Sequence, residues 1–317
     1  MALMLDLAAQ GAQMSLVLAL APGLLGLTRK IKARLLRRRG PPIVQPYRDL
    51  AKLLRKEAVV AENASWLFRS APYMIFVATW VAASLIPTFA TGLIFSWTAD
   101  LIAITALLGS ARFFLALVGM DVGTSFGGIG SSREAMFATL AEPAMIMISF
   151  TVALIAGSTQ LSSVAEHMLS HLELRVSLGL ALFGLIIVAL AENARIPVDN
   201  PATHLELTMV HEAMILEYSG RHLAVIEMAA ALKLLLYVSL AACIFAPWGL
   251  APPGAGPLFW AIGVVAYLFK LLAGGCMLAV FETSIAKMRV FRVPELLGAA
   301  LMLGFLGVLL LFVSRSL

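Results

Sequence analysis

The chain has little charge for its length. Asp, Glu, Lys and Arg make up 13% of its 317 residues, against roughly 25% in ordinary soluble domains, and 61% of the residues are hydrophobic. Its mean hydropathy is +0.94, and its apolar runs approach the roughly 20 residues that a helix needs to cross a bilayer. This composition excludes a water-soluble globular protein. It predicts an all-α integral membrane protein.

Cysteine is also scarce. Cys243 and Cys276 both lie in apolar runs and lack the spacing of metal ligands, which excludes a disulfide framework and an iron–sulfur cluster held by this chain. We interpret both as small buried hydrophobic residues. The sequence shows no nucleophile–base arrangement, so catalysis by this chain alone is not expected. The glycine-rich stretch 123–130 (GTSFGGIG) lacks a preceding strand and the spacing of a phosphate-binding loop. It predicts a tight loop between two spans.

Hydropathy and length predict about eight transmembrane helices in one polytopic membrane domain, residues 1–317. The expected spans are residues 3–27, 72–91, 100–120, 134–156, a span ending near 191, 223–245, 258–281 and 293–313. Residues 46–60 combine apolar residues at helical spacing with many charges, so we expect an amphipathic helix along the membrane surface. The cytoplasmic loops are expected at about 28–71, 120–134, 192–222 and 282–293.

The positive charge is unevenly distributed. Twelve of the 23 Lys and Arg residues lie between Arg29 and Arg69, an excess that is typical of cytoplasmic loops. This confinement explains the net charge of +5 better than a nucleic-acid-binding face, which needs basic residues spread over a surface. We therefore expect a multi-pass protein of the inner (cytoplasmic) membrane, with both termini on the outer side.

Residues 192–220 form the longest polar interval downstream of this basic segment, with five carboxylates, Arg195, His204 and His211. A membrane protein places such a segment at the interface or in a protein-lined cavity, because lipid does not solvate it. Pro197 and Pro201 should interrupt any helix, which is expected to resume over 203–218. His211 is followed by glutamate but not by the second histidine of a zinc-protease helix, so the pattern does not favour a metal site. It favours a proton relay or the docking of a cationic partner, with a solvated charged loop as the alternative.

Among the charged residues that fall within or close to the expected spans are Arg112, Glu142, Lys233 and Lys270. Each costs roughly 2.5–3.5 kcal/mol at the centre of a membrane helix. Several of them together indicate either a hydrated route for protons or ions, or charge pairs that stabilise the bundle. Both interpretations remain open from the residues alone.

Three stretches resemble a known family. Residues 37–57 (RRRGPPIVQPYRDLAKLLRKE) resemble the first cytoplasmic loop of the membrane subunit that adjoins the hydrophilic arm of respiratory complex I, called subunit 1. Residues 130–142 (GSSREAMFATLAE) and the interval that begins ENARIPVD are similar to later loops of the same family. The resemblance implies eight spans and a subunit that shapes much of the quinone chamber.

The sequence departs from the complex I pattern inside the acidic loop. Ala202 and His204 stand where that pattern carries further acids, and Glu282 stands near the place of an arginine. The form PVDNPATHLELTMVHEAMILEYSG is similar to the corresponding subunit of membrane-bound [NiFe] hydrogenases of the formate hydrogenlyase and hydrogenase-4 type. That resemblance implies a non-catalytic membrane anchor that couples a soluble hydrogenase module to proton- or ion-translocating subunits.

The resemblance also implies partners. These are hydrogenase large and small subunits and ferredoxin-like Fe–S subunits on the cytoplasmic side, antiporter-like membrane subunits, and lipid, but no nucleic acid. The [NiFe] and Fe–S clusters are expected in the partner subunits, with no cofactor bound by this chain and no requirement for quinone. The alternative is the quinone-chamber subunit of a complex I-like NADH dehydrogenase. A stand-alone ion transporter is a third reading, which the loop matches disfavour.

Two sets of site residues follow from these patterns. The residues expected in a proton or ion relay are Glu142, Glu192, Asp199, Glu206, Glu212, Glu217, Lys233 and Lys270. The residues expected to organise the loops and dock partners are Arg37, Gln45, Asp49, Lys52, Glu57, Arg133, Arg195 and Tyr218.

Overall fold

A computed structural model describes residues 2–171, 175–198, 210–286, 288 and 292–316. Its elements are α1 (Ala2–Leu35), α2 (Gln45–Leu54), α3 (Trp66–Leu85), the 3₁₀ helix η1 (Ile94–Thr98), α4 (Leu101–Asp121), α5 (Ser125–Ala156), α6 (Leu161–Ser170), α7 (Val176–Glu192), α9 (His211–Ile215), α10 (Gly220–Phe245), α11 (Pro257–Ser284) and α12 (Val293–Ser316). Within these residues the regular elements are all helices, which confirms the predicted fold class.

Six helices are long and apolar enough to cross a membrane, namely α1, α4, α5, α10, α11 and α12. The apolar helix α7 is shorter, at 17 residues, and the 20-residue α3 is not among the six. These eight helices correspond to the eight expected spans. Because two of them fall outside the six, the count of eight remains a prediction.

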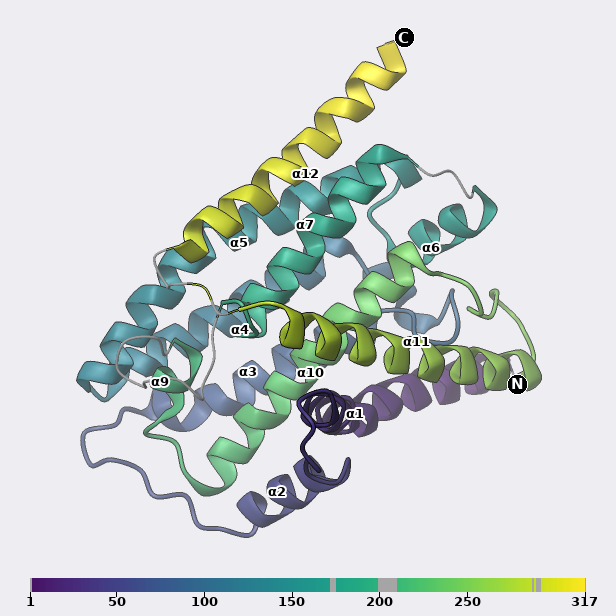
Figure 1. Cartoon of the computed structure of the whole chain (residues 1–317). Helices are drawn as coiled ribbons and strands as arrows, with labels where there is room; N and C mark the ends of the chain where they lie inside the picture. The colour runs from purple at the N-terminus through teal and green to yellow at the C-terminus, as the bar shows by residue number, and fades with distance from the viewer. Residues whose placement is uncertain (1, 172–174, 199–209, 287, 289–291, 317) are drawn as a thin grey trace.

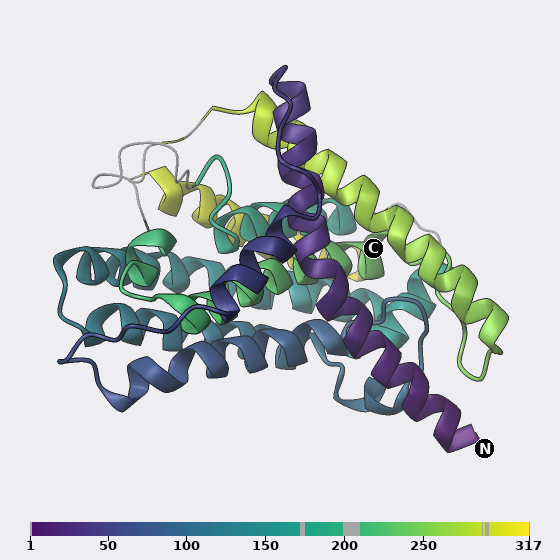
Figure 2. The same cartoon turned by 90° about the horizontal axis from the view of Figure 1, so that it is seen from below.

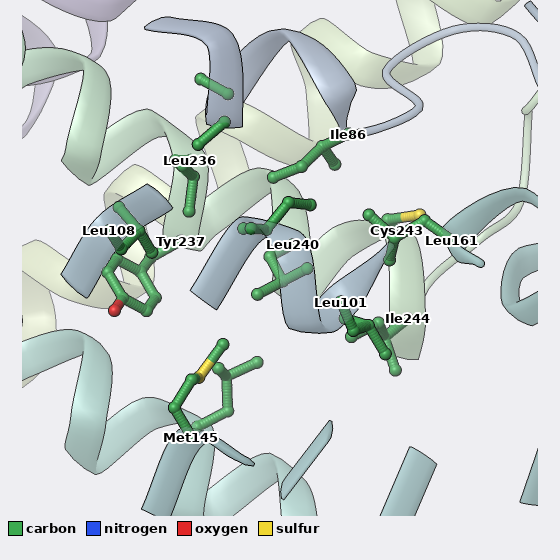
Figure 3. Packing of buried hydrophobic residues seen from close by; sticks show 14 of the residues in the cluster. Ile86, Leu101, Leu108, Met145, Leu161, Leu236, Tyr237, Leu240, Cys243 and Ile244 are labelled. Carbon is green, nitrogen blue, oxygen red and sulfur yellow. The ribbon is translucent and has the colours of Figure 1, made fainter. Parts of the chain in front are cut away.

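Helix α10 lies at the centre of the bundle and is the most buried of the six. It packs against α1, α3, α7 and α11. Helices α1 and α11 run side by side along one flank, while α12 lies against α5 and α7 (Figures 1 and 2). In the core, Leu236 and Leu240 of α10 lie among side chains from α3, α4 and α5, including Ile86 just beyond α3 (Figure 3). The central position of α10 means that any charge on its inner faces is enclosed by protein.

The tight loop predicted over 123–130 is wrong beyond residue 124, because α5 already begins at Ser125. The hydroxyl oxygen of Thr124 accepts a hydrogen bond from the backbone N–H of Gly127 at 3.3 Å and caps the helix. A Cβ on Gly127 would lie 2.0 Å from the carbonyl oxygen of Gly119 on α4. The glycines therefore allow two membrane helices to approach closely, which is a common use of small residues in membranes.

The surface helix is also shorter than expected, ending at Leu54 rather than near residue 60. The backbone of Val59 is bonded elsewhere: its N–H donates to the Ser219 hydroxyl oxygen at 2.8 Å, and its carbonyl accepts from that hydroxyl at 2.9 Å. Helix α2 packs on α1 and α10, and the Tyr47 hydroxyl donates to the carbonyl of Ala19. The first span is longer than expected, because α1 continues to Leu35 with Lys32 and Arg34 in its last turn, where cations are favourable.

Candidate functional site

A cluster of charged side chains lies inside the helix bundle; we call it the buried charge cluster. Its members come from four helices: Arg112 (α4), Glu134 and Glu142 (α5), Glu192 (α7) and Lys233 (α10). Arg112 forms a close ion pair with Glu192 and lies 3.1 Å (Nε) from Oε1 of Glu134. Lys233 Nζ lies 2.7 Å from the second carboxylate oxygen of Glu192. One carboxylate, Glu192, thus joins two cations.

The cluster is shielded to different degrees. The side chains of Arg112 and Glu192 are 5% and 6% exposed, whereas Glu142 is 45% exposed and lies 3.8 Å from Nη1 of Arg112. Charges buried this deeply are stable only when they are paired, and such pairs add little net stability compared with apolar residues. Stabilisation of the bundle therefore does not by itself account for the arrangement.

A cavity of about 320 Å³ lies beside this cluster; we call it the polar cavity. It is lined by α1, α9, α10, α11 and the segment that follows α7, and its titratable lining residues are Arg29, Lys32, Arg195, His211, Glu212, Glu227 and Glu282. The side chain of Glu282 is 4% exposed, with one oxygen 3.0 Å from Nζ of Lys32 and the other 3.2 Å from Nη1 of Arg195. This carboxylate ties the end of α11 to α1 and to the loop after α7.

Burial changes the acidity of two basic residues of the cavity wall. The pKa of Arg195 is lowered mainly by burial, and Arg29 adds to this, while Glu282 opposes it. Burial also lowers the pKa of His211 to about 4; the charge of Lys233 adds to the shift and the charge of Glu134 opposes it. Neutral histidine is therefore the form in this environment near pH 7.

The structure brings together part of the relay predicted from the sequence. Glu142, Glu192 and Lys233 belong to the buried charge cluster, and Glu212 lines the polar cavity. Glu217 is exposed after α9, and Lys270 on α11 belongs to neither group. Asp199 and Glu206, with His204, lie outside the described residues.

The residues predicted for loop organisation and docking fall into three environments. Arg195 lines the cavity, while Arg37, Lys52 and Glu57 are exposed and Arg133 is partly buried on α5. Gln45 donates to Asp49 at 2.8 Å within α2. Tyr218 is 4% exposed, stacks on Phe68 with ring centroids 4.0 Å apart, and donates to the carbonyl of Phe68 at 2.9 Å. Its observed contacts hold two parts of this chain together.

The sequence patterns did not group Arg112, Glu134, Glu227 and Glu282 with the residues expected in a relay. Arg112 was recognised as a buried charge, but its acidic partners were not identified. Glu134 lies eight residues before Glu142, so both occupy one stripe of a continuous helix. Both also lie in the expected span 134–156, so the sequence already allowed this relation. Glu227 lies six residues before Lys233 in the expected span 223–245. A carboxylate within a membrane span is itself a sign of a functional residue, so the sequence alone could have identified it. In the described part of the chain, no group of three or more His, Cys, Asp or Glu side chains is arranged to hold a metal ion.

Comparisons with known proteins place these features in a family context. The family model described as NADH dehydrogenase matches residues 9–313. Formate hydrogenlyase subunit 4 of Escherichia coli (strain K12) is 34% identical over 297 residues, covering 93% of this chain and 95% of that protein. Hydrogenase-4 component C of the same organism is 35% identical over 240 residues, covering 76% of this chain and 75% of that protein.

More distant similarity extends to complex I. A subunit of the NADH-quinone oxidoreductase of Rhodospirillum rubrum is 25% identical over 257 residues, covering 77% of this chain and 73% of that protein. The fold is similar to a chain in the structure of the membrane-bound sulfane sulfur reductase, an archaeal respiratory membrane complex. The TM-score is 0.80 at 19% identity, covering 96% of this chain and 99% of the other. These relatives are components of multi-subunit respiratory membrane complexes, and they confirm the resemblance inferred from the loop motifs.

Proposed function

The chain belongs to the NADH dehydrogenase family, and from this premise we propose that it is the membrane anchor and coupling subunit of a multi-subunit hydrogenase of the formate hydrogenlyase type. In this role it links a soluble [NiFe]/Fe–S module to proton- or ion-translocating membrane subunits. The chain itself is non-catalytic. The similarity to formate hydrogenlyase subunit 4 over nearly its whole length supports this choice within the family.

The observation that carries the proposal is the buried charge cluster. An anchor alone requires an apolar lipid-facing surface and a docking loop, not two cations and three carboxylates between its helices. Paired charges inside a membrane protein commonly mark proton or ion pathways. The cluster lies beside the polar cavity. A redox change in a docked module can therefore act on charged side chains that continue from the cavity into the bundle.

The proposal extends to the setting of the chain. The hydrogenase large and small subunits and ferredoxin-like Fe–S subunits dock on the cytoplasmic loops, and antiporter-like subunits pack against the membrane helices. The metal clusters belong to those partners, the chain lies in the inner membrane, and both termini face outward. The positive charge between Arg29 and Arg69 supports this orientation.

A second candidate is the quinone-chamber subunit of a complex I-like NADH dehydrogenase. The polar cavity favours it, since about 320 Å³ is enough for a small-molecule headgroup. The two candidates separate when the tagged chain is purified from native membranes in mild detergent and its partners are analysed. Nickel, iron and a hydrogenase large subunit support the first candidate, while flavin-containing NADH-oxidising subunits without nickel support the second.

Coupling is tested with Glu192→Gln in the assembled complex. This change removes the charge that joins Arg112 and Lys233 but keeps the side-chain shape. We expect ion movement per redox turnover to fall sharply while the partners still co-purify. Glu166→Gln, on the exposed surface of α6, is the matched control and should couple normally. Normal coupling by Glu192→Gln would show that the cluster is not part of a relay.

A further inference from the structure

His211 lies where the polar cavity and the buried charge cluster come closest. It is the first residue of α9 and lines the cavity with Arg195 and Glu212. The same helix packs against α5, because a Cβ on Gly130 would lie 3.1 Å from Cβ of Ala213. Glu134 of the cluster lies one helical turn beyond Gly130, on the same side of α5. Helix α9 therefore contacts the cavity and the part of α5 that carries the cluster.

Helix α10 also carries both residues that line the cavity and a residue of the buried charge cluster. Ala230 and Ala231 line the cavity, and Lys233 of the cluster follows within one turn. Ala230 precedes Lys233 by three residues, so these two side chains lie about one turn apart on nearly the same face of α10. The charges of both Lys233 and Glu134 act on His211. The cavity lining and the cluster therefore adjoin on α10, and His211 lines the cavity on a helix that packs against α5.

Titratable and charged groups line the cavity with His211 or act on it electrostatically. These are Arg29 and Lys32 of α1, Glu134 of α5, Arg195 after α7, Glu212 of α9, Glu227 and Lys233 of α10, and Glu282 of α11. Arg112 lies on α4, which also packs against α9. Carboxylates are thus present on both sides of the histidine. Glu212 and Glu227 lie on the cavity side, and Glu134 lies on the cluster side.

We propose that His211 transfers protons between the cavity carboxylates and the buried charge cluster, an inference that rests on the coupling function proposed above. A protonated cavity carboxyl gives its proton to the free ring nitrogen, and the other ring nitrogen gives its proton to the carboxylate of Glu134. One carboxyl is lost, one is formed, and the ring ends as its other tautomer. Rotation of the imidazole by half a turn then points its N–H toward Glu134 and its free nitrogen toward the cavity, so the ring can transfer the next proton without changing tautomer.

The chemistry of the neutral ring suits this role. Neutral imidazole has one N–H donor and one acceptor nitrogen, so it can accept and release a proton at different atoms. Burial and Lys233 both disfavour imidazolium here. Imidazolium is therefore a minor form near pH 7, and the ring does not hold a second proton at equilibrium.

The first test compares His211→Gln with Glu192→Gln in the assembled complex in sealed membrane vesicles. Hydrogen evolution and proton movement, followed with a pH-sensitive dye, are measured together. We expect His211→Gln to lower proton movement per hydrogen evolved by ~tenfold or more, with co-purification of the partners unchanged. If Glu192→Gln uncouples and His211→Gln does not, His211 is not the proton carrier but the proposed function survives. If neither uncouples, the proposed function itself fails.

Chemical rescue separates proton transfer from a structural role. His211→Ala removes the imidazole side chain and leaves space for it in the cavity. Added imidazole should restore coupling in that variant, and the rescue should increase as the pH approaches the pKa of free imidazole. Pyrazole has a similar shape but is a far weaker base, and it should not restore coupling. Equal rescue by both compounds, or rescue by neither while assembly remains intact, would overturn the proposal.

Discussion

Arg112 is central to the buried charge cluster, because it lies within ion-pair distance of all three carboxylates. Its own side chain is 5% exposed, so it has little access to solvent if a partner is lost. Buried ion pairs are costly to break from one side, since the remaining charge keeps its desolvation penalty without compensation. Loss of Arg112 is therefore expected to leave the carboxylates of α5 and α7 without their shared counter-charge.

We predict that Arg112→Met destabilises the protein by about 3–5 kcal/mol, the usual cost of removing one partner of a buried pair. The free energy of unfolding in detergent, measured with denaturant, checks this. Arg69→Met is the matched control: Arg69 is exposed on α3, and its loss should change stability by less than about 0.5 kcal/mol. Similar values for the two variants would contradict the assigned role of Arg112.

The lowered pKa of His211 predicts that the free energy of unfolding depends on pH. Its pKa is about 4 in the folded protein, against 6.5 for the unperturbed group. Between these values the unfolded chain binds a proton that the folded chain does not, so stability falls as the pH is lowered from 6.5 to 4. The total effect is up to about 3 kcal/mol, and below pH 4 this residue contributes no further change.

The check is a series of melting temperatures in detergent between pH 7 and pH 4. His211→Gln should show a flatter profile than the wild type over this window. His171→Gln, at an exposed position after α6, is the matched control and should follow the wild type. A profile for His211→Gln that parallels the wild type would show that the histidine is not held neutral.

The packing of α4 against α5 depends on glycines rather than on a loop. A Cβ at Gly127 would lie 2.0 Å from the backbone oxygen of Gly119, so the helices must move apart to accept it. The neighbouring Gly128 has open space on its free side. The two positions differ in packing while sharing the same helix and the same residue type.

We predict that Gly127→Ala destabilises the protein by about 1–3 kcal/mol, the range for overpacking a close contact. Gly128→Ala should be neutral or stabilising by up to about 1 kcal/mol, since alanine favours helix over glycine. Thermal unfolding of both variants in the same detergent provides the comparison. Equal stability of the two would mean that α4 and α5 do not approach as closely as described.

In the molecule as a whole, one carboxylate connects distant segments around the polar cavity. Glu282 pairs with Lys32, which lies 250 residues away, and with Arg195, which lies 87 residues away. Figures 1 and 2 show how α1 and α11 run along each other on this flank of the bundle. The two ion pairs therefore connect three parts of the cavity wall: α11, α1 and the segment that follows α7.

We predict that Glu282→Gln loosens this wall, because two cations lose their shared counter-charge. Hydrogen exchange measured by mass spectrometry should become faster in residues 279–286 and in the last turns of α1. Exchange in the centre of α10 should not change, since those residues are held by apolar packing. Glu295→Gln, at an exposed position in the first turn of α12, is the matched control. Unchanged exchange around Glu282 would show that its ion pairs do not hold the segments together.

The membrane class, the positions of most helices and the acidic interval were predictable from the sequence, because each depends on the local sum of hydropathy and charge. The loop motifs identified the family for the same reason, since they are contiguous. The true start of α5 was missed, because glycine-rich sequence is compatible with a loop and with a tight helix contact, and only the proximity of Gly119 selects the second. The pairings of Arg112 with Glu192 and of Glu282 with Lys32 required the tertiary structure. These residues lie far apart in sequence, and no helical period encodes which helix faces which.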